Sequence, residues 1–245
     1  MRIATWNMQG GTNTVYVTSV LATTQADVLC LQECGAFYRV LWDRTPLVKA
    51  SGETIGYRGT FRSTGRELFT VYWENDWVQG SLAVMTSLPY IASGVIIPSG
   101  VPLAGGGVWH PPNPRWMPWV TVSPPGPAHA PALAYRIYSI HSPSGYGIAD
   151  TCAWNNTQLN RMPGLIAHGI SPRWICMGDF NADPTAAGFV APTTAGSRIV
   201  RLRRASHQNE QLLDYAVTNV PALAPVEIVK VGGAADHYPQ VFHLP

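Results

Sequence analysis

Apolar residues occur along this chain mainly in short runs bounded by glycine, proline and polar residues. Short apolar runs bounded in this way are typical of buried strands. We expect strands over residues 2–7, 28–32, 69–74, 81–86, 119–122, 133–141, 174–178, 198–203, 213–218 and 238–243. Helical spacing of apolar residues predicts helices over Tyr16–Thr24 and Asp150–Ile166, and a short third helix over Thr185–Val190. Many strands with few helices predict an α+β protein in which helices flank two packed sheets.

The stretch from Pro98 to Pro131 is rich in proline and glycine, which predicts loops on either side of a strand near Val120. The chain contains no internal repeat and no linker long enough to separate two domains. Because 245 residues can bury one large core, we expect a single domain over residues 1–245.

Composition indicates a soluble globular protein, with 46% apolar and 12% charged residues and no apolar run long enough to span a membrane. The net charge is only +2, far from that of a dedicated nucleic-acid binder. The basic residues are nevertheless almost all arginine, since Lys49 and Lys230 are the only lysines. The guanidinium group matches phosphate oxygens in a bidentate way, so this bias favours phosphate recognition.

The cysteines have no metal-binding spacing. Cys30 and Cys176 lie in apolar runs and are expected to be buried free thiols, whereas Cys34 and Cys152 are the exposed candidates for one disulfide. The chain opens directly on strand residues without a visible signal peptide. We therefore expect either a cytosolic protein or the mature form of a secreted one.

Four polar clusters end or follow apolar runs, and together they suggest one constructed site. They are Thr5-Trp6-Asn7, Leu31-Gln32-Glu33, Gly178-Asp179-Phe180-Asn181 and Ala235-Asp236-His237-Tyr238-Pro239. Their oxygen ligands suit a hard divalent cation, and their histidine suits proton transfer. This combination predicts the hydrolysis of phosphate esters.

Asp179 and Asn181 are two positions apart, so in an extended segment both side chains would face the same spot. One could orient a nucleophilic water and the other could hold a phosphate. The alternative is a strand that simply ends in an Asx-turn.

His237, beside Asp236, could take a proton from an attacking water because the pKa of imidazole lies near neutral pH. Asp214 is a charge within an apolar run, which is costly unless a histidine pairs with it. His141 ends another run and could be a second catalytic imidazole. For each histidine, a structural or solvated role is the alternative.

Glu33 is the natural ligand for Mg²⁺, which prefers few carboxylates and several waters, and Asn7 could add an oxygen. Mn²⁺ and Ca²⁺ are alternative ions. The run Arg198–Arg204 reads as an alternating strand with arginine on one face. It could be either a solvated sheet face or a contact surface for a phosphate backbone.

The ordered set of these motifs resembles the endonuclease/exonuclease/phosphatase superfamily, and within it the catalytic B subunit of cytolethal distending toxins. The residues that carry the resemblance are Trp6-Asn7, Gln32-Glu33, His141, Gly178-Asp179-Phe180-Asn181, Ser206-His207, Leu213-Asp214-Tyr215-Ala216 and Asp236-His237-Tyr238-Pro239. The similarity covers residues 2 to about 243, with an insertion around 123–132.

The resemblance implies a four-layer α/β/β/α sandwich of the deoxyribonuclease I kind. It implies that Glu33 binds magnesium with Asn7 and Asp236 nearby, that His141 and His237 act as the acid/base pair, and that Asp214 orients a histidine. It also points to Arg66 and Arg115 as residues that bind phosphate. The chain departs from the pattern at Ala235 and Ser142, and neither change removes a ligand or an acid/base group.

The function implied is a magnesium-dependent, sequence-independent DNA endonuclease that acts as the catalytic subunit of a secreted toxin. Such a subunit would dock on carrier subunits and act in the nucleus of a target cell. A phosphoinositide phosphatase with a lipid headgroup as substrate, and a non-catalytic binding protein on the same fold, are the alternative functions.

Overall fold

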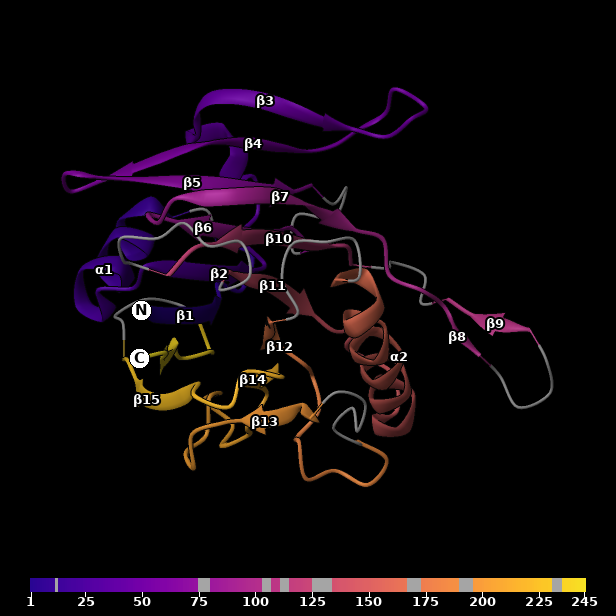
Figure 1. The fold of residues 1–245 in the computed structure, drawn as a ribbon. Helices are drawn as coiled ribbons and strands as arrows, with labels where there is room; N and C mark the ends of the chain where they lie inside the picture. Colours follow the sequence, from indigo (N-terminus) through magenta and orange to yellow (C-terminus); the bar gives the residue numbers. More distant parts are fainter. Residues whose placement is uncertain are drawn as a thin grey trace.

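The computed structural model describes residues 1–11, 13–74, 80–102, 107–110, 115–124, 134–166, 173–189, 196–230 and 235–245. Its larger sheet, here called the first sheet, has the strand order β15-β16-β1-β2-β6-β5-β4-β3 (Figure 1). These strands are β1 (Arg2–Asn7), β2 (Val28–Gln32), β3 (Trp42–Val48), β4 (Thr54–Ser63), β5 (Arg66–Trp73), β6 (Leu82–Thr86), β15 (Ala224–Ile228) and β16 (Gln240–His243).

The second sheet has the order β13-β14-β12-β11-β10-β7. Its strands are β7 (Tyr90–Ile96), β10 (Met117–Val122), β11 (Tyr135–His141), β12 (Trp174–Asp179), β13 (Arg198–Val200) and β14 (Asp214–Thr218). A small hairpin of β8 (Val101–Pro102) and β9 (Val108–Trp109) projects from the body (Figure 1). The helices are α1 (Thr14–Thr24), α2 (Ile148–Ile166) and the short 3₁₀ helix η1 (Phe37–Val40).

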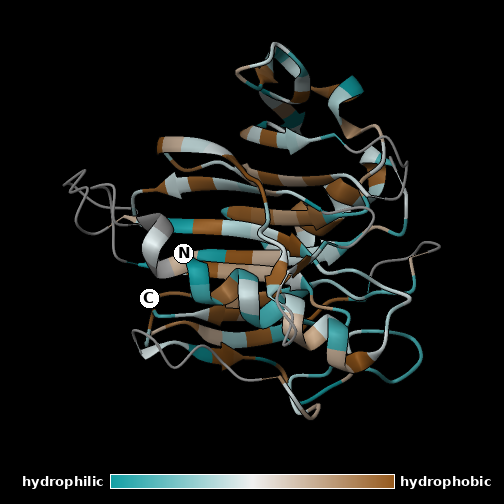
Figure 2. Cartoon of the chain, turned by 90° about the vertical axis from the view of Figure 1, so that its right-hand side faces the viewer, coloured by the Kyte–Doolittle hydropathy of each residue, from teal (hydrophilic) through white to brown (hydrophobic). Residues whose placement is uncertain are grey.

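Three apolar clusters define four layers. One cluster lies between the sheets and joins residues such as Val84 of β6 to Val120 of β10. A second packs α1 on the outer face of the first sheet, and a third packs α2 on the outer face of the second sheet. Figure 2 shows the apolar residues concentrated in the stacked strands. The predicted α/β/β/α sandwich is therefore confirmed.

Strand alternation explains how one segment serves two layers. In β2, Val28 and Cys30 belong to the cluster between the sheets, whereas Leu29 and Leu31 pack under α1. Gln32 follows the same alternation and donates from Nε2 to Ser139 Oγ of the second sheet, at 2.8 Å. Polar residues at the ends of such strands are thus directed into the space between the sheets.

The two ends of the chain lie side by side in the first sheet. β1 pairs antiparallel with β16, with Arg2 opposite His243 and Thr5 opposite Gln240. The Met1 amino group donates to the Leu244 carbonyl at 2.7 Å. The first and last strands of the sequence are therefore neighbours.

Most of the predicted elements are confirmed, although their ends shift by up to three residues. The predicted helix over Thr185–Val190 is wrong, because Thr185 to Phe189 form turns and Val190 lies outside the described residues. The Arg198–Arg204 strand is shorter than predicted and ends at Val200. Strands β3, β4, β7, β8, β9 and β15 were not predicted; of these, β3 and β15 are edge strands with mostly exposed side chains. Within Pro98–Pro131 the strand near Val120 is confirmed as β10, but the β8–β9 hairpin lies where only loop was predicted. Residues 103–106, 111–114 and 125–133 lie outside the described part of the chain.

The predicted exposure of two cysteines is also wrong. Cys34 is buried in the layer under α1, and Cys152 is buried in the layer under α2. These layers lie on opposite sides of the sandwich, so the two thiols cannot form a disulfide. All four cysteines are free and buried. Among the described residues, no helix is long and apolar enough to cross a membrane.

Candidate active site

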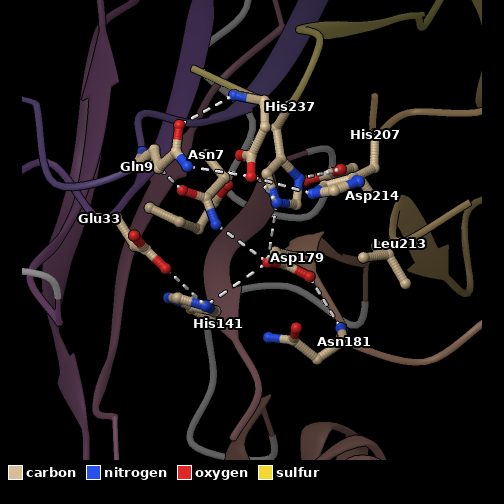
Figure 3. Close-up of polar contacts among 12 residues, drawn as sticks. Asn7, Gln9, Glu33, His141, Asp179, Asn181, His207, Leu213, Asp214 and His237 are labelled. Atoms are coloured by element: carbon tan, nitrogen blue, oxygen red, sulfur yellow. Dashed lines mark hydrogen bonds and ion pairs between the residues drawn. The ribbon is translucent and has the colours of Figure 1, made fainter. Parts of the chain in front are cut away.

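The candidate site lies at the carboxyl ends of parallel strands in both sheets. In the second sheet, β11 and β12 place His141 beside Asp179, and β14 places Asp214 on the other side of Asp179. In the first sheet, β1 and β2 end together, with Asn7 beside Gln32. By strand alternation all these side chains lie on the inner faces, so the two sheets direct them toward one point (Figure 3).

Asp179 is the centre of this cluster. Its buried carboxylate accepts a hydrogen bond from Asn7 Nδ2 at 2.9 Å and from the Asn181 amide at 2.8 Å. The Nε2 atoms of His141 and His237 lie 3.5 and 3.7 Å from Asp179 Oδ2. Burial, together with the neighbouring Asp214, raises the pKa of the Asp179 carboxyl well above its usual range. Asp179 is therefore a carboxylate able to exchange a proton near neutral pH.

His237 is held by a buried carboxylate, as expected from the sequence. Its Nδ1 lies 2.7 Å from Asp214 Oδ2, which leaves Nε2 directed at Asp179. Burial alone would lower the pKa of His237, but Asp214, with smaller contributions from Asp179 and Asp236, outweighs it and raises the pKa to about 9. His237 is thus protonated in the metal-free protein at neutral pH.

His141 has the opposite character. It is almost completely buried, and burial together with the positive charge of Arg115 and of His237 lowers its pKa well below the usual value. Its Nε2 lies 3.4 Å from Glu33 Oε1, and because the ring is neutral this contact is not an ion pair. The two histidines therefore differ in charge although both face Asp179.

Glu33 follows β2 at the edge of the site and is partly exposed, with 18% of its side chain accessible. Burial raises its pKa, against the opposing effect of Arg115 and of a hydrogen bond with Asn7. Its backbone φ is +49°, and Gln9 and Asn181 also have positive φ values of +52° and +47°. Three non-glycine residues in the left-handed region around one site indicate local backbone strain that surrounding packing maintains.

Asp236 is fixed by two neighbours that sequence reasoning gave no role. Its Oδ2 accepts from Gln9 Nε2 at 3.0 Å and lies 3.1 Å from His207 Nε2. Its backbone amide in turn donates to Gln9 Oε1 at 3.1 Å. Among the described residues, its Oδ1 atom is buried without a hydrogen-bond partner. The oxygens of Asp236, Glu33 and Asn7 are of the type that a hard divalent cation prefers, and Asn7 Oδ1 also accepts from the Gln9 amide at 2.9 Å.

His207, Asp236 and His237 also form a group whose ligand atoms lie within 4.8 Å of one another. His207 Nδ1 accepts a hydrogen bond from the Asn209 amide at 3.0 Å, so the proton of the neutral ring is on Nε2. In this state His207 donates to Asp236 and positions it. The only sequence signal for His207 was the resemblance of Ser206-His207 to the toxin subunits. For Gln9 it was the resemblance of Ala4-Thr5-Trp6-Asn7-Met8-Gln9-Gly10 to the first residues of those subunits.

Asn181 is close to Asp179 but not in the way the spacing suggested. β12 ends at Asp179, and the Asn181 amide donates to the Asp179 carboxylate in an Asx-turn. The expectation of two side chains pointing the same way along an extended strand was therefore wrong. Asn181 Nδ2 instead donates to the Ser142 carbonyl at 2.9 Å, beside the site.

The structure brings Arg115 to the site. Its Nη1 donates to the same Ser142 carbonyl at 3.1 Å, and its guanidinium group acts electrostatically on Glu33 and Asp179. Burial lowers the pKa of Arg115. The guanidinium group nevertheless stays charged, because the ordinary pKa of arginine is far above neutral pH. Arg115 is therefore a cation next to two carboxylates, where a substrate phosphate could be bound.

Arg66 is not part of the site, and its assignment as a phosphate-binding residue was wrong. β5 begins at Arg66, at the end of the first sheet where β2 begins with Val28. The guanidinium group donates to the Ala26 carbonyl at 2.8 Å and to Ser87 Oγ at 2.9 Å. Since Glu33 follows the other end of β2, the two residues lie at opposite ends of the sheet.

Comparison with known proteins agrees with this geometry. A model of the endonuclease/exonuclease/phosphatase family matches residues 4–237. No curated protein sequence matches. The solved structure of the cytolethal distending toxin from Haemophilus ducreyi is similar, with 19% identity and a TM-score of 0.67 over 98% of this chain and 96% of that chain.

Two other similar structures belong to different proteins. The catalytic domain of human nocturnin, solved with bound sulfate, has 14% identity and a TM-score of 0.61 over 99% of this chain and 93% of that chain. The mannosyl-6-phosphatase from Bacteroides thetaiotaomicron has 13% identity and a TM-score of 0.62 over 99% and 98%. At these identities the likeness establishes the fold and leaves the substrate open.

Proposed function

Because the chain belongs to the endonuclease/exonuclease/phosphatase family, we propose that it is a magnesium-dependent phosphodiesterase that nicks DNA without sequence preference. The observation that carries the proposal is the convergence of His141, Asp179 and the Asp214–His237 pair on one point between the sheets. One neutral and one protonated imidazole around a titratable carboxylate suit the transfer of protons during hydrolysis.

In this proposal Glu33, Asn7 and Asp236 hold the cation, which supplies charge stabilisation to the phosphate oxygens when bound. Mn²⁺ or Ca²⁺ could replace Mg²⁺. Oxygen donors dominate this set, which favours such hard ions over zinc.

Asp179 orients the attacking water and, because its pKa is raised, accepts its proton. His237 begins in the protonated state and donates a proton to the leaving oxygen. The neutral His141 directs Nε2 toward a phosphate oxygen, and Arg115 adds a positive charge on that side. His237 thus serves first as the acid in this assignment, in contrast to its expected role as the base.

DNA is the proposed substrate, and a phosphoinositide headgroup is the alternative. The likeness to cytolethal distending toxins supports the further proposal of a secreted catalytic subunit that docks on carrier subunits and acts in the nucleus of a target cell. Co-purification of a partner from the native source would test the docking. A native preparation that contains this chain alone would count against it.

A paired assay tests the proposed activity. The wild-type protein and Glu33→Gln would be incubated with supercoiled plasmid and with an inositol phospholipid, each with Mg²⁺ or with excess EDTA. We expect nicking by the wild type that EDTA abolishes. Glu33→Gln should bind Mg²⁺ more weakly and therefore need a higher Mg²⁺ concentration for half-maximal nicking. Full activity in excess EDTA would refute metal dependence. Phosphate release from the lipid without plasmid nicking would refute the nuclease proposal and support the phosphoinositide phosphatase.

A further inference from the structure

A groove of about 650 Å³ lies between the open edges of the two sheets. One wall is the segment after β13, which is the edge strand of the second sheet, and the other is β15, the edge strand of the first sheet. Both strands lie at the same end of the sandwich (Figure 1). The lining residues are Arg201, Leu202, Arg203, Arg204, Pro225, Val226, Glu227 and Ile228.

The groove carries positive charge that takes no part in hydrogen bonds or ion pairs among the described residues. Arg201, Arg203 and Arg204 are exposed, and within the described part of the chain none of their guanidinium groups has a hydrogen bond or an ion pair. The one acidic residue of the lining, Glu227, is paired with Arg2 at 2.6 Å. Arg198, by contrast, donates to the carbonyls of Pro221 and Leu223 and belongs to the fold.

Both walls of the groove lead to the candidate active site. Three residues after Arg204 comes His207, whose Nε2 lies 3.1 Å from Asp236. On the other wall, Ile228 pairs with Gln240, and the Val229 amide donates to the Pro239 carbonyl at 2.9 Å, two residues after His237. Three extended residues span at most about 11 Å, so the groove begins that close to His207.

We propose that this groove binds the phosphodiester backbone of the DNA strand that continues away from the cleaved bond. The inference rests on the proposed nuclease function and names the surface that would distinguish a polymer from a compact substrate. One strand of duplex DNA carries a phosphate about every 3.4 Å of helix axis, so a few nucleotides reach from the site into the groove. An isolated headgroup bound at Asp179 does not extend that far.

The test compares two double variants with equal loss of charge. Arg201→Ala with Arg204→Ala removes two of the three arginines that line the groove. Arg44→Ala with Arg62→Ala removes two exposed arginines from β3 and β4, at the opposite edge of the first sheet. Binding of a fluorescent 20-base-pair duplex would be measured by anisotropy in excess EDTA, which should abolish turnover, over a range of salt concentrations. Hydrolysis of bis(p-nitrophenyl) phosphate would report on the catalytic centre.

We expect the groove variant to bind the duplex at least about tenfold more weakly near 0.15 M salt. Its plot of log K against log salt should lose about two units of slope, because each phosphate contact contributes about 0.9. The control variant should change less than about twofold, and neither variant should alter hydrolysis of the small diester. Lysine at both groove positions should restore most of the slope.

Equal behaviour of the two double variants, or no binding of the duplex by the wild type, would overturn the groove assignment. The proposed activity is judged separately by plasmid nicking. If the wild type nicks plasmid and the groove variant binds duplex normally, the proposed nuclease activity is supported and only the role of the groove is refuted.

Discussion

At the scale of single residues, the site depends on local environments that give chemically similar groups different pKa values. His141 and His237 are both imidazoles, yet Arg115 and burial keep one neutral while Asp214 keeps the other charged. Asp179 lies between them with a raised pKa. The division of roles therefore comes from neighbours rather than from residue type.

The 2.7 Å contact between His237 and Asp214 predicts that these residues act as one unit. His237→Ala should lower kcat by roughly 10²–10⁴-fold, the usual value of acid–base assistance. Asp214→Asn should cost a comparable or smaller factor. The double variant should be scarcely slower than His237→Ala alone, because the effects of coupled groups are not additive.

Single-turnover kinetics of the four proteins would measure these losses, with circular dichroism as a control for folding. Losses that multiply would show that Asp214 acts independently of His237, for example as a purely structural carboxylate.

Residue types and order were enough to predict which residues meet at the candidate site, except for Arg66, whereas contacts that depend on loop geometry could not be predicted. Asp214 was identified because a lone charge in an apolar strand needs a partner. Gln9 and His207 were not assigned roles, because each acts through Asp236 and lies in a turn whose path the sequence does not specify. Arg66 was misplaced because a short motif does not show which end of a long hairpin faces the site.

At the scale of elements, the close approach of β11 and β12 sets the spacing of His141 and Asp179. Gly178 has a φ of +150°, and a Cβ atom there would lie 2.0 Å from the Ile140 carbonyl oxygen. Backbone atoms of a neighbouring strand cannot move away from such a contact without disturbing the strand pairing. Glycine is therefore required where these two strands place His141 and Asp179 in the candidate site.

Gly178→Ala should destabilise the protein by roughly 2–4 kcal/mol, because a clash with a neighbouring strand adds to an unfavourable φ. It should also reduce activity in the fraction that remains folded, since His141 and Asp179 would move apart. Urea unfolding and kinetics at a low urea concentration would measure both effects.

The matched control is Gly164→Ala on α2, where an added Cβ meets nothing within 4 Å. This change should leave activity unaltered and stabilise the helix by about 0.5–1 kcal/mol. If Gly178→Ala were as stable and active as the control, the close approach of the strands would not constrain the site.

Elements that bury apolar residues could be predicted, and exposed ones could not. β2 and β12 are buried along their full length and are visible as apolar runs. β3 and β15 lie at the edges of the first sheet with mostly exposed side chains, and each contains a proline and a charged residue that interrupt its apolar positions. The helix predicted at Thr185 is absent for a different reason. The Thr185 amide donates to Asp183 Oδ1, and this hydrogen bond stabilises a turn that does not continue into a helix.

At the scale of the whole molecule, the charges of the site make stability depend on pH. The pKa of His237 is about 9 in the folded, metal-free protein, above the value of about 6.5 for a free imidazole. The stabilisation by protonated His237 is therefore complete below about pH 6.5 and is lost as the pH rises through 9. The raised pKa of Asp179 acts in the same direction, because a carboxylate there is costlier than the neutral acid.

The Tm of the EDTA-treated wild type should accordingly fall between pH 7 and 9.5. The His237→Asn variant should show a smaller fall, since it lacks the group that releases its proton on unfolding. Differential scanning calorimetry at matched ionic strength would measure both profiles. Parallel profiles would mean that the Asp214–His237 contact does not raise the pKa of His237.

The adjacency of the first and last strands has a consequence for how the protein is made. β1 needs β16 as its neighbour, and Trp6 Nε1 donates to the His237 carbonyl at 3.2 Å, across a sequence separation of 231 residues. A nascent polypeptide on the ribosome already holds Trp6 and Asn7 while the residues up to His237 are still to be added. Pairings of such long range also close slowly. Translation thus completes the candidate site only once His237 has been added, and a chain truncated before His237 should have no hydrolytic activity.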